Sequence, residues 1–362
     1  MSFKCGLIGL PNVGKSTLFN ALTNLKVPSE NFPFCTIHPN IGIVPIYDIR
    51  LKKLSDIVNP DRIVPAFVKF VDIAGLIKGS HKGEGLGNKF LQDIRTVDAL
   101  IHVVRCFKDD SVIHVNNVIN PIVDVQLIND ELIFSDYEMC EKIIIQLQKR
   151  NKHCRKKICV DSLVLEVCLN HLKKGYMLNS LFFNEQDKNI IKKFNFITYK
   201  PIMYVVNIND SKKDSDILDN LLKFLKLKKC HIISFCALSK KFNLNVNVQT
   251  KVQISNNENL YCEKLNEVIL SGFNLLGLHT FFTVGKKEIK SWVVKKGIVA
   301  IEAARKIHTD LKKGFIRAQI VSYKNFVKYN GEAGSKKFGK YRSEGKNYQI
   351  QDGDIVHFLF NV

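Results

Sequence analysis

A glycine-rich loop near the start of the chain constrains its fold more than any other segment. Residues 9–16 read Gly-Leu-Pro-Asn-Val-Gly-Lys-Ser, which is a G-x-x-x-x-G-K-S pattern. A short apolar run at residues 4–8 precedes the loop and a helix-like stretch at 17–22 follows it, so the context is strand, loop and helix. In such a loop, backbone N–H groups converge on a phosphate and the dipole of the following helix adds to their attraction. The pattern predicts an α/β P-loop domain that binds a nucleoside triphosphate.

Within this loop the residue types indicate separate roles. We expect the Lys15 ammonium to reach the β- and γ-phosphates and the Ser16 hydroxyl to coordinate Mg²⁺. Backbone groups and first-turn side chains complete the predicted phosphate site, which comprises Asn12, Val13, Gly14, Lys15, Ser16 and Thr17.

A second phosphate-side motif follows a strand-like run at residues 66–71. Asp72-Ile-Ala-Gly75 is a D-x-x-G pattern, in which Asp72 would hold Mg²⁺ through water and the Gly75 N–H would contact the γ-phosphate. Thr36 lies between the two motifs and is placed to be a further Mg²⁺ ligand. The predicted metal site is therefore Ser16, Thr36 and Asp72.

A candidate base-reading motif follows the strand-like run at residues 202–206. Asn207-Ile-Asn-Asp210 resembles an N-K-x-D motif in which Ile208 replaces the lysine, while the Asp210 carboxylate could accept the N1–H and N2–H of guanine. Cys236-Ala237, after the next strand-like run, occupies the place of a backbone contact to the base. These residues leave the identity of the base open.

The 362-residue chain carries 54 basic and 34 acidic residues, a formal charge of +20, which favours a polyanionic partner. Half of this excess lies in residues 278–362, with 17 Lys/Arg and 7 Asp/Glu, and six more Lys/Arg fall within residues 149–157. The ten cysteines form no C-x-x-C pair, and we find neither a signal-peptide layout nor an apolar run long enough for a transmembrane helix. We therefore expect a cytoplasmic protein with reduced thiols and no membrane partner.

The pattern of apolar residues divides the chain into regions. Strand-like and helix-like stretches alternate up to about residue 120, and further strands are expected at 99–104 and 231–233. Residues 124–199 show apolar positions at three- and four-residue spacing, which predicts two long helices packed against each other. From about residue 278 the pattern changes to short strands with glycine turns, typical of a small β-rich domain.

Three regions together closely resemble the YchF subfamily of Obg-related P-loop proteins, the Obg-like ATPases. The resemblance rests on GLPNVGKST, NFPFCTIHPN and VDIAGLIKGSHKGEGLGNKFL near the start, and on KIHTDLKKGFIRAQ, YNGEAGSKKFGKYRSEGKNYQIQDGD and FLFNV near the end. It implies a Ras-like P-loop G domain over 1–123 and 200–277, a helical coiled-coil-like insert over 124–199, and a β-grasp TGS domain over 278–362. It also implies ATP hydrolysis in preference to GTP and a link to ribosomes, translation and stress responses.

The resemblance also bears on catalysis. Leu76 stands where signalling GTPases carry the glutamine that orients water, so hydrolysis should be slow and needs another polar group. By resemblance that group is His114, with His81 and His102 as alternatives; His102 lies in an apolar strand and is more typical of a core residue.

The adenine contact implied by the resemblance is Asn207 with the main chain of Ile208. Two features depart from the family pattern: Asp210 replaces a glutamate, and residues 238–258 lose an acidic helical pattern. We expect a monomer that binds ATP, and GTP more weakly, and that contacts the ribosome or rRNA through the basic helical tip and the TGS domain. The alternatives are a GTPase of the same fold and a nucleotide-gated RNA-binding adaptor with incidental hydrolysis.

Overall fold

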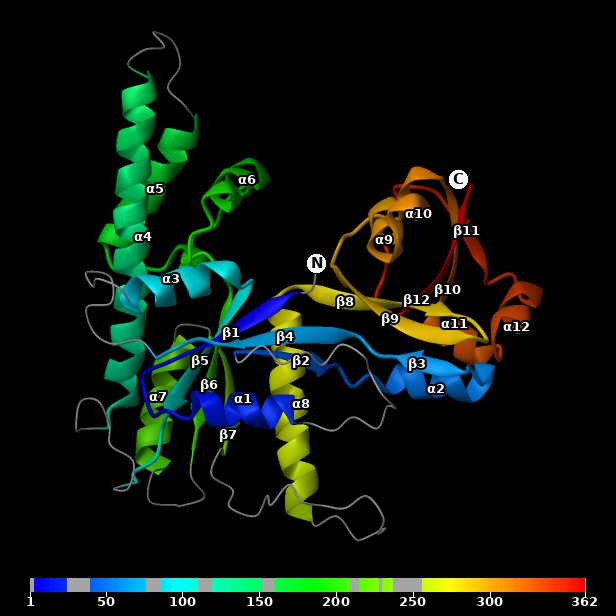
Figure 1. Ribbon diagram of the computed structural model, residues 1–362, viewed down its shortest axis with the longest axis horizontal. Helices are drawn as coiled ribbons and strands as arrows, with labels where there is room; N and C mark the ends of the chain where they lie inside the picture. Colours follow the sequence, from blue (N-terminus) through cyan, green and yellow to red (C-terminus); the bar gives the residue numbers. More distant parts are fainter. Residues whose placement is uncertain are drawn as a thin grey trace.

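Two six-stranded sheets organise the chain, and a pair of long helices stands beside the first of them (Figure 1). The computed structural model describes most of the sequence, namely residues 3–24, 40–75, 86–109, 119–151, 160–208, 215–227, 230–236 and 256–361. Over these ranges, no helix has both the length and the apolar character that a membrane crossing requires.

The first sheet has the strand order β2-β4-β1-β5-β6-β7, with β2 antiparallel to β4 and all other neighbours parallel. The predicted strands at 66–71, 99–104, 202–206 and 231–233 are confirmed. Because the parallel strands share a direction, the residues that follow them meet at one edge of the sheet, where α/β folds bind ligands. The strands are β1 (Lys4–Ile8), β2 (Ile41–Pro45), β4 (Phe67–Asp72), β5 (Ala99–Arg105), β6 (Ile202–Asn207) and β7 (His231–Phe235).

Helices cover both faces of this sheet, because successive strand residues point to opposite faces. Val205 packs in the cluster that contains Ile269, whereas its neighbours Tyr204 and Val206 pack in the cluster that contains Leu221. The covering helices, besides the first part of α4 (Pro121–Asn151), are α1 (Lys15–Thr23), α3 (Leu86–Thr96), α7 (Ser215–Leu227) and α8 (Asn256–Leu275).

The helical insert forms an arm beside the first sheet (Figure 1). Its longest helix starts on the sheet, where Val125 is buried, and continues to Cys140 and Ile144, which pack against Leu165 and Cys168 of the next helix. The predicted pair of packed helices is confirmed, whereas residues 152–159 of the basic run lie outside the described residues. The elements of this helical arm are α4 (Pro121–Asn151), α5 (Val160–Lys173), the 3-10 helix η1 (Leu178–Ser180) and α6 (Glu185–Phe194).

The second sheet combines the C-terminal strands with one strand from much earlier in the chain. Its order is β11-β10-β12-β8-β9-β3, and β3 pairs in parallel with β9. Residues 49–64, which the sequence analysis assigned to the range 1–123, therefore lie on this sheet. The strands are β3 (Arg62–Val64), β8 (Leu278–Val284), β9 (Glu288–Lys295), β10 (Phe315–Ser322), β11 (Arg342–Glu344) and β12 (Asp354–Phe360).

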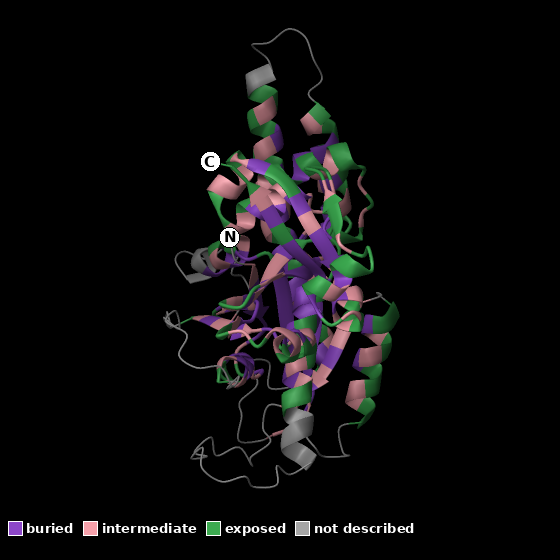
Figure 2. Cartoon of the chain, turned by 90° about the vertical axis from the view of Figure 1, so that its right-hand side faces the viewer, coloured by how far each residue is buried: buried purple, intermediate pink, exposed green. Residues whose placement is uncertain are grey.

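Both faces of the second sheet are also covered. Phe281 packs against Ala303 and Ala304 on one face, whereas the adjacent Phe282 packs with Leu54 and Phe326 on the other. Figure 2 shows buried residues concentrated on the strands between these helices. The covering helices, with one short helix that follows them, are α2 (Ile49–Val58), α9 (Ala300–Ile307), α10 (Thr309–Lys313), α11 (Tyr323–Lys328) and α12 (Glu332–Lys337).

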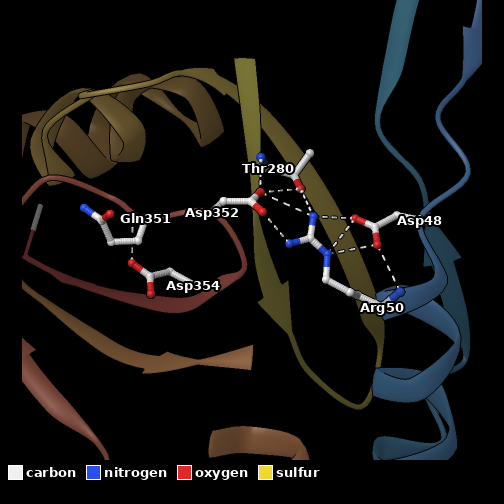
Figure 3. Close-up of polar contacts among 6 residues, drawn as sticks. All are labelled: Asp48, Arg50, Thr280, Gln351, Asp352 and Asp354. Atoms are coloured by element: carbon white, nitrogen blue, oxygen red, sulfur yellow. Dashed lines mark hydrogen bonds and ion pairs between the residues drawn. The ribbon is translucent and has the colours of Figure 1, made fainter. Parts of the chain in front are cut away.

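An arginine joins the start of α2 to the second sheet (Figure 3). The Arg50 guanidinium donates to the Asp48 carboxylate at 2.8–3.0 Å, to Thr280 Oγ1 at 2.8 Å and to Asp352 Oδ2 at 2.8 Å. The Arg50 guanidinium also lies 5.1 Å from the centroid of the Phe282 ring. One side chain thus joins the start of α2 to two segments that lie more than 200 residues later in the sequence.

We expect Arg50→Ala to destabilise this region by about 2 kcal/mol, because hydrogen bonds to charged partners are worth about 1.5–3 kcal/mol. Arg62→Ala is the matched control: Arg62 makes an exposed ion pair with Glu288, and exposed pairs contribute about 0–1 kcal/mol. Urea denaturation of both variants measures the difference. Equal losses of unfolding free energy in the two variants would contradict a larger contribution of Arg50 to stability.

The same contacts predict a dependence on pH. Burial opposes ionisation of Asp352, but hydrogen bonds from Arg50 and the Thr280 N–H outweigh it and lower the pKa of the carboxyl. Because the unfolded state then takes up the proton first, this stabilisation is present above about pH 4, the ordinary aspartate pKa, and is lost as the pH falls below it. The stability deficit of Arg50→Ala should therefore shrink below about pH 4.

Candidate functional site

The loop between β1 and α1 has the backbone conformation that its glycines allow. Gly14 has φ 98°, and a Cβ on Gly9 would lie 2.5 Å from the Val103 carbonyl oxygen, so neither position tolerates a larger residue without strain. Helix α1 begins at Lys15, directly after the loop, and exposes Ser16 and Thr17 in its first turn. The predicted strand–loop–helix arrangement is confirmed, and the N–H groups at the start of α1 are available to an anion.

Lys15 lies across this loop and is only 7% exposed. Its Nζ donates to the carbonyl oxygens of Gly9 at 3.1 Å and Leu10 at 2.7 Å. Burial lowers the pKa of Lys15 to about 8, partly offset by the Asp72 carboxylate.

The two phosphate-side motifs meet at the carboxyl ends of β1 and β4. Ser16 Oγ donates to Asp72 Oδ2 at 2.8 Å, although the residues are 56 positions apart. Gly75 lies beside the loop, since a Cβ on it would be 3.1 Å from Pro11 and 3.2 Å from Lys15 Nζ. A hydroxyl and a carboxylate oxygen are ligands that Mg²⁺ accepts, so this pair fits the predicted ion. Thr36 lies outside the described residues.

The candidate base-reading residues lie at the same edge. Asn207 ends β6, is 2% exposed, and its Nδ2 donates to the carbonyl oxygen of Val13 at 3.0 Å. The Ile208 N–H donates to the Phe235 carbonyl at 2.8 Å, and Cys236 follows directly after β7. The structure therefore places Asn207, Ile208 and Cys236 together with the phosphate loop. Ala237 and Asp210 lie outside the described residues.

Of the three candidate histidines, only His102 falls within the described residues. It is 1% exposed in β5, its ring centroid is 5.3 Å from that of Tyr204, and burial lowers its pKa to about 3. His102 is therefore a neutral core residue, as its apolar surroundings predicted. His81 and His114 lie outside the described residues, so the assignment of His114 as catalytic stays a prediction.

Arg105, at the end of β5, is a site residue that the sequence analysis missed. Although 1% exposed, it donates to the carbonyl oxygens of Phe107 at 3.2 Å and Asp109 at 3.0 Å, and its guanidinium lies 4.7 Å from the Phe107 ring centroid. It therefore fixes the backbone where the chain leaves the sheet next to Asn207, its register partner on β6. The sequence does contain a sign of this role, because Arg105 directly follows a strand of five apolar residues and one histidine.

A buried polar network joins α3, which follows the D-x-x-G motif in sequence, to the helical arm. Lys200 Nζ donates to three carbonyl oxygens at the end of α3, those of Ile94, Arg95 and Val97, at 2.6–2.9 Å. Arg95 Nη2 lies 3.3 Å from Oδ1 of the buried Asp136 on α4, and Asp136 Oδ2 accepts the Thr198 N–H and hydroxyl at 2.7 Å. The network thus connects α3 to the base of the arm.

Comparisons with known proteins extend over the whole chain. A family model described as "50S ribosome-binding GTPase" matches residues 4–135, and the YchF GTPase C-terminal model, described as "Protein of unknown function (DUF933)", matches residues 278–361. Proteins named "Ribosome-binding ATPase YchF" from Buchnera aphidicola (subspecies Acyrthosiphon pisum) and Haemophilus influenzae are 51% and 46% identical over 366 and 363 residues, covering 100% of both chains.

A solved structure agrees with these relatives. The Schizosaccharomyces pombe YchF GTPase matches with a TM-score of 0.85 and 32% identity, over 99% of this chain and 98% of its own. This match and the P-loop geometry confirm the predicted fold class of an α/β P-loop domain with a helical insert and a C-terminal domain. On the identity and coverage of these relatives, the chain belongs to the YchF family.

Proposed function

We propose that this protein is a slow, Mg²⁺-dependent ATPase that works in the cytoplasm and uses its nucleotide state to regulate its association with ribosomes. The observation that carries the proposal is the meeting of Ser16 and Asp72 at 2.8 Å beside Lys15. Together these residues supply the oxygen ligands and the cation that a Mg²⁺-bound triphosphate requires. The full-length relatives are named ribosome-binding ATPases, which supports ATP as the nucleotide and the ribosome as the partner.

Each part of the proposed site has a separate task. Ser16, Asp72 and Thr36 would hold Mg²⁺, which, when bound, offsets negative charge on the phosphate oxygens. Lys15 and the N–H groups of residues 12–17 bind the triphosphate, and the Gly75 N–H contacts the γ-phosphate. On the base side, Asn207 and the main chain of Ile208, Cys236 and Ala237 surround the ring.

We expect ATP to bind more tightly than GTP. The opposite preference is the second candidate function, because the Asp210 carboxylate can accept from guanine and the related Schizosaccharomyces pombe structure bears the name "GTPase". Competition of unlabelled ATP and GTP against a fluorescent ATP analogue measures the preference on the purified chain. Tighter displacement by GTP would make the protein a GTPase, and Asp210→Glu should then shift the preference towards ATP.

We expect His114→Ala to reduce turnover by about tenfold or more while ATP affinity stays nearly constant. Leu76 cannot orient water, and positioned acid–base groups are worth about 10²–10⁴-fold in rate. Single-turnover hydrolysis measures the chemical step, and His81→Ala, which removes the alternative candidate, is measured alongside. If His114→Ala instead lowers the melting temperature and leaves the single-turnover rate intact, the residue is structural.

The ribosome is proposed as a partner of the basic regions. Residues 278–362 have a net charge of +10, and the run at 149–157, which lies between α4 and α5 in the sequence, adds six cations. Phosphate neutralisation by such residues is sensitive to salt and largely independent of base sequence. Cosedimentation of the protein with ribosomes in the presence of ATP, ADP or no nucleotide tests the regulation, and identical binding in all three states would contradict it.

A further inference from the structure

Helices α11 and α12 lie at the part of the second sheet that is far from the helical arm (Figure 1), and an aromatic stack is formed by residues that follow them. The rings of Tyr329, after α11, and Phe338, after α12, are stacked with centroids 4.6 Å apart and planes 25° apart. Phe338 is nevertheless 59% exposed, so one partner of the stack presents much of its ring to solvent. We call this stack and the basic residues around it the Phe338 surface, which comprises Lys328, Tyr329, Lys336, Lys337, Phe338, Lys340 and Arg342.

The backbone holds the stack in place. A Cβ on Gly334 would lie 1.8 Å from the Tyr329 carbonyl oxygen, so α12 can approach Tyr329 this closely only because residue 334 is glycine. The Phe338 N–H donates to the Gly334 carbonyl at 3.1 Å, and the buried Ser335 hydroxyl donates to the Gly331 carbonyl at 2.8 Å. The Phe338 ring is therefore ordered before any partner arrives, which lowers the entropy cost of binding.

Basic side chains lie near the aromatic residues of this region. Lys328 Nζ lies 5.4 Å from the centroid of the Tyr329 ring, and Lys336 Nζ lies 4.7 Å from that of Tyr341. Residues 324–346 contain seven Lys/Arg and two Asp/Glu. Lys336 is bound to Glu332 at 2.6 Å, whereas Lys337 and Lys340 extend from exposed positions on either side of Phe338. The surface therefore combines a flat apolar face with positive charge.

We propose that the Phe338 surface binds single-stranded RNA, with one base stacked on Phe338 and the flanking lysines on phosphates. Proteins that bind single strands combine these two elements, because every base has a π-face and every linkage carries a negative charge. A duplex hides its base faces, and an acidic peptide segment has no planar group to cover the ring. The inference builds on the proposed ribosome association and assigns an RNA contact to particular residues.

The test is fluorescence anisotropy of a labelled twelve-nucleotide oligoadenylate with the full-length protein. We expect Phe338→Ala to weaken binding by about tenfold, since stacking on an aromatic side chain is worth about 1–3 kcal/mol per base, and Phe338→Trp to retain it. The matched control is Phe182→Ala, which removes a fully exposed ring (103%) from the helical arm. Residues 181–187 contain no Lys or Arg, so this substitution should leave the affinity for oligoadenylate unchanged.

Heparin separates stacking from charge, because it is a polyanion without bases. Phe338→Ala should leave heparin affinity unchanged, whereas Lys337→Gln and Lys340→Gln should weaken the binding of both heparin and oligoadenylate. Each lysine substitution should also reduce the log–log slope of oligoadenylate affinity against salt concentration by about 0.7. Unchanged oligoadenylate affinity in Phe338→Ala, or an equal loss for heparin, would overturn the proposal. Polyglutamate serves as a third ligand. If Phe338→Ala weakens binding of polyglutamate but not of oligoadenylate, the proposal is also overturned, and the result points to an acidic protein partner.

ATP turnover and ribosome cosedimentation of the unmodified protein, measured alongside, keep the two proposals apart. If the protein hydrolyses ATP and sediments with ribosomes while Phe338→Ala binds oligoadenylate normally, the RNA inference fails alone. If the protein shows neither activity, the proposed function fails, and the oligoadenylate comparison still decides whether Phe338 contacts RNA.

Discussion

Lys15→Ala should weaken ATP binding by about 100-fold or more. In the folded protein this ammonium group is held on the phosphate loop by the Gly9 and Leu10 carbonyl oxygens, so little reorganisation is needed to bring it to the phosphates. Its removal leaves negative charge on the β- and γ-phosphates uncompensated, and two lost charge-assisted hydrogen bonds at about 1.5–3 kcal/mol each account for this magnitude. Isothermal titration calorimetry with Mg²⁺-ATP measures the affinity.

Two comparisons show whether the loss is specific to the phosphate site. Lys223→Ala removes an exposed lysine from α7 and should bind ATP normally. Lys15→Met keeps the aliphatic stem, which is buried, and should fail to bind while retaining the melting temperature of the parent. Unchanged ATP affinity in Lys15→Ala would contradict the assignment of this loop as the nucleotide site.

The parts of the site that sequence could predict are those in which local pattern and strand order carry the information. The phosphate loop is one continuous segment whose glycines fix its backbone. Asp72, Asn207 and Cys236 each end or follow a strand of the parallel sheet, so their common edge follows from the order of the strands. The contacts of Asp72 with Ser16 and of Asn207 with Val13 follow from that strand order and the position of the loop.

Other features depend on tertiary contacts that leave no periodic trace in the sequence. Strand β3 is only three residues long and acquires its identity by pairing with β9, more than 200 positions away. Arg105 is a local case of the same difficulty: the carbonyl groups of Phe107 and Asp109, two and four residues later, accept from its guanidinium, and this depends on how the chain turns after the strand. Lys200 resembles any surface lysine until three carbonyls at the end of α3 are seen around it.

Asp136→Ala should produce the largest loss of stability, about 3–5 kcal/mol. The Asp136 side chain is fully buried and accepts two hydrogen bonds from Thr198 while it faces Arg95. Its removal leaves the Thr198 donors and the Arg95 guanidinium without their buried carboxylate, and breaking a buried pair from one side costs about this amount. Urea denaturation followed by circular dichroism of the helices measures the change. A matched control is Glu138→Ala, which removes an exposed carboxylate two residues along α4.

A double-mutant cycle shows whether the charge itself matters. If Arg95 and Asp136 act as a pair, the loss in the double variant Arg95→Ala/Asp136→Ala should be smaller than the sum of the two single losses. Additive losses would contradict coupling across the network.

The pH dependence of Arg95→Ala gives an independent check. Burial raises the pKa of Asp136, and the bonds from Thr198 and the charge of Arg95 only partly offset this effect. Without Arg95 the folded-state pKa should rise further, so ionised Asp136 destabilises the protein at neutral pH. This penalty is relieved as the pH falls through the raised pKa and the carboxyl takes up a proton. The deficit of Arg95→Ala relative to the parent should therefore shrink on acidification, whereas a purely steric defect would not change with pH.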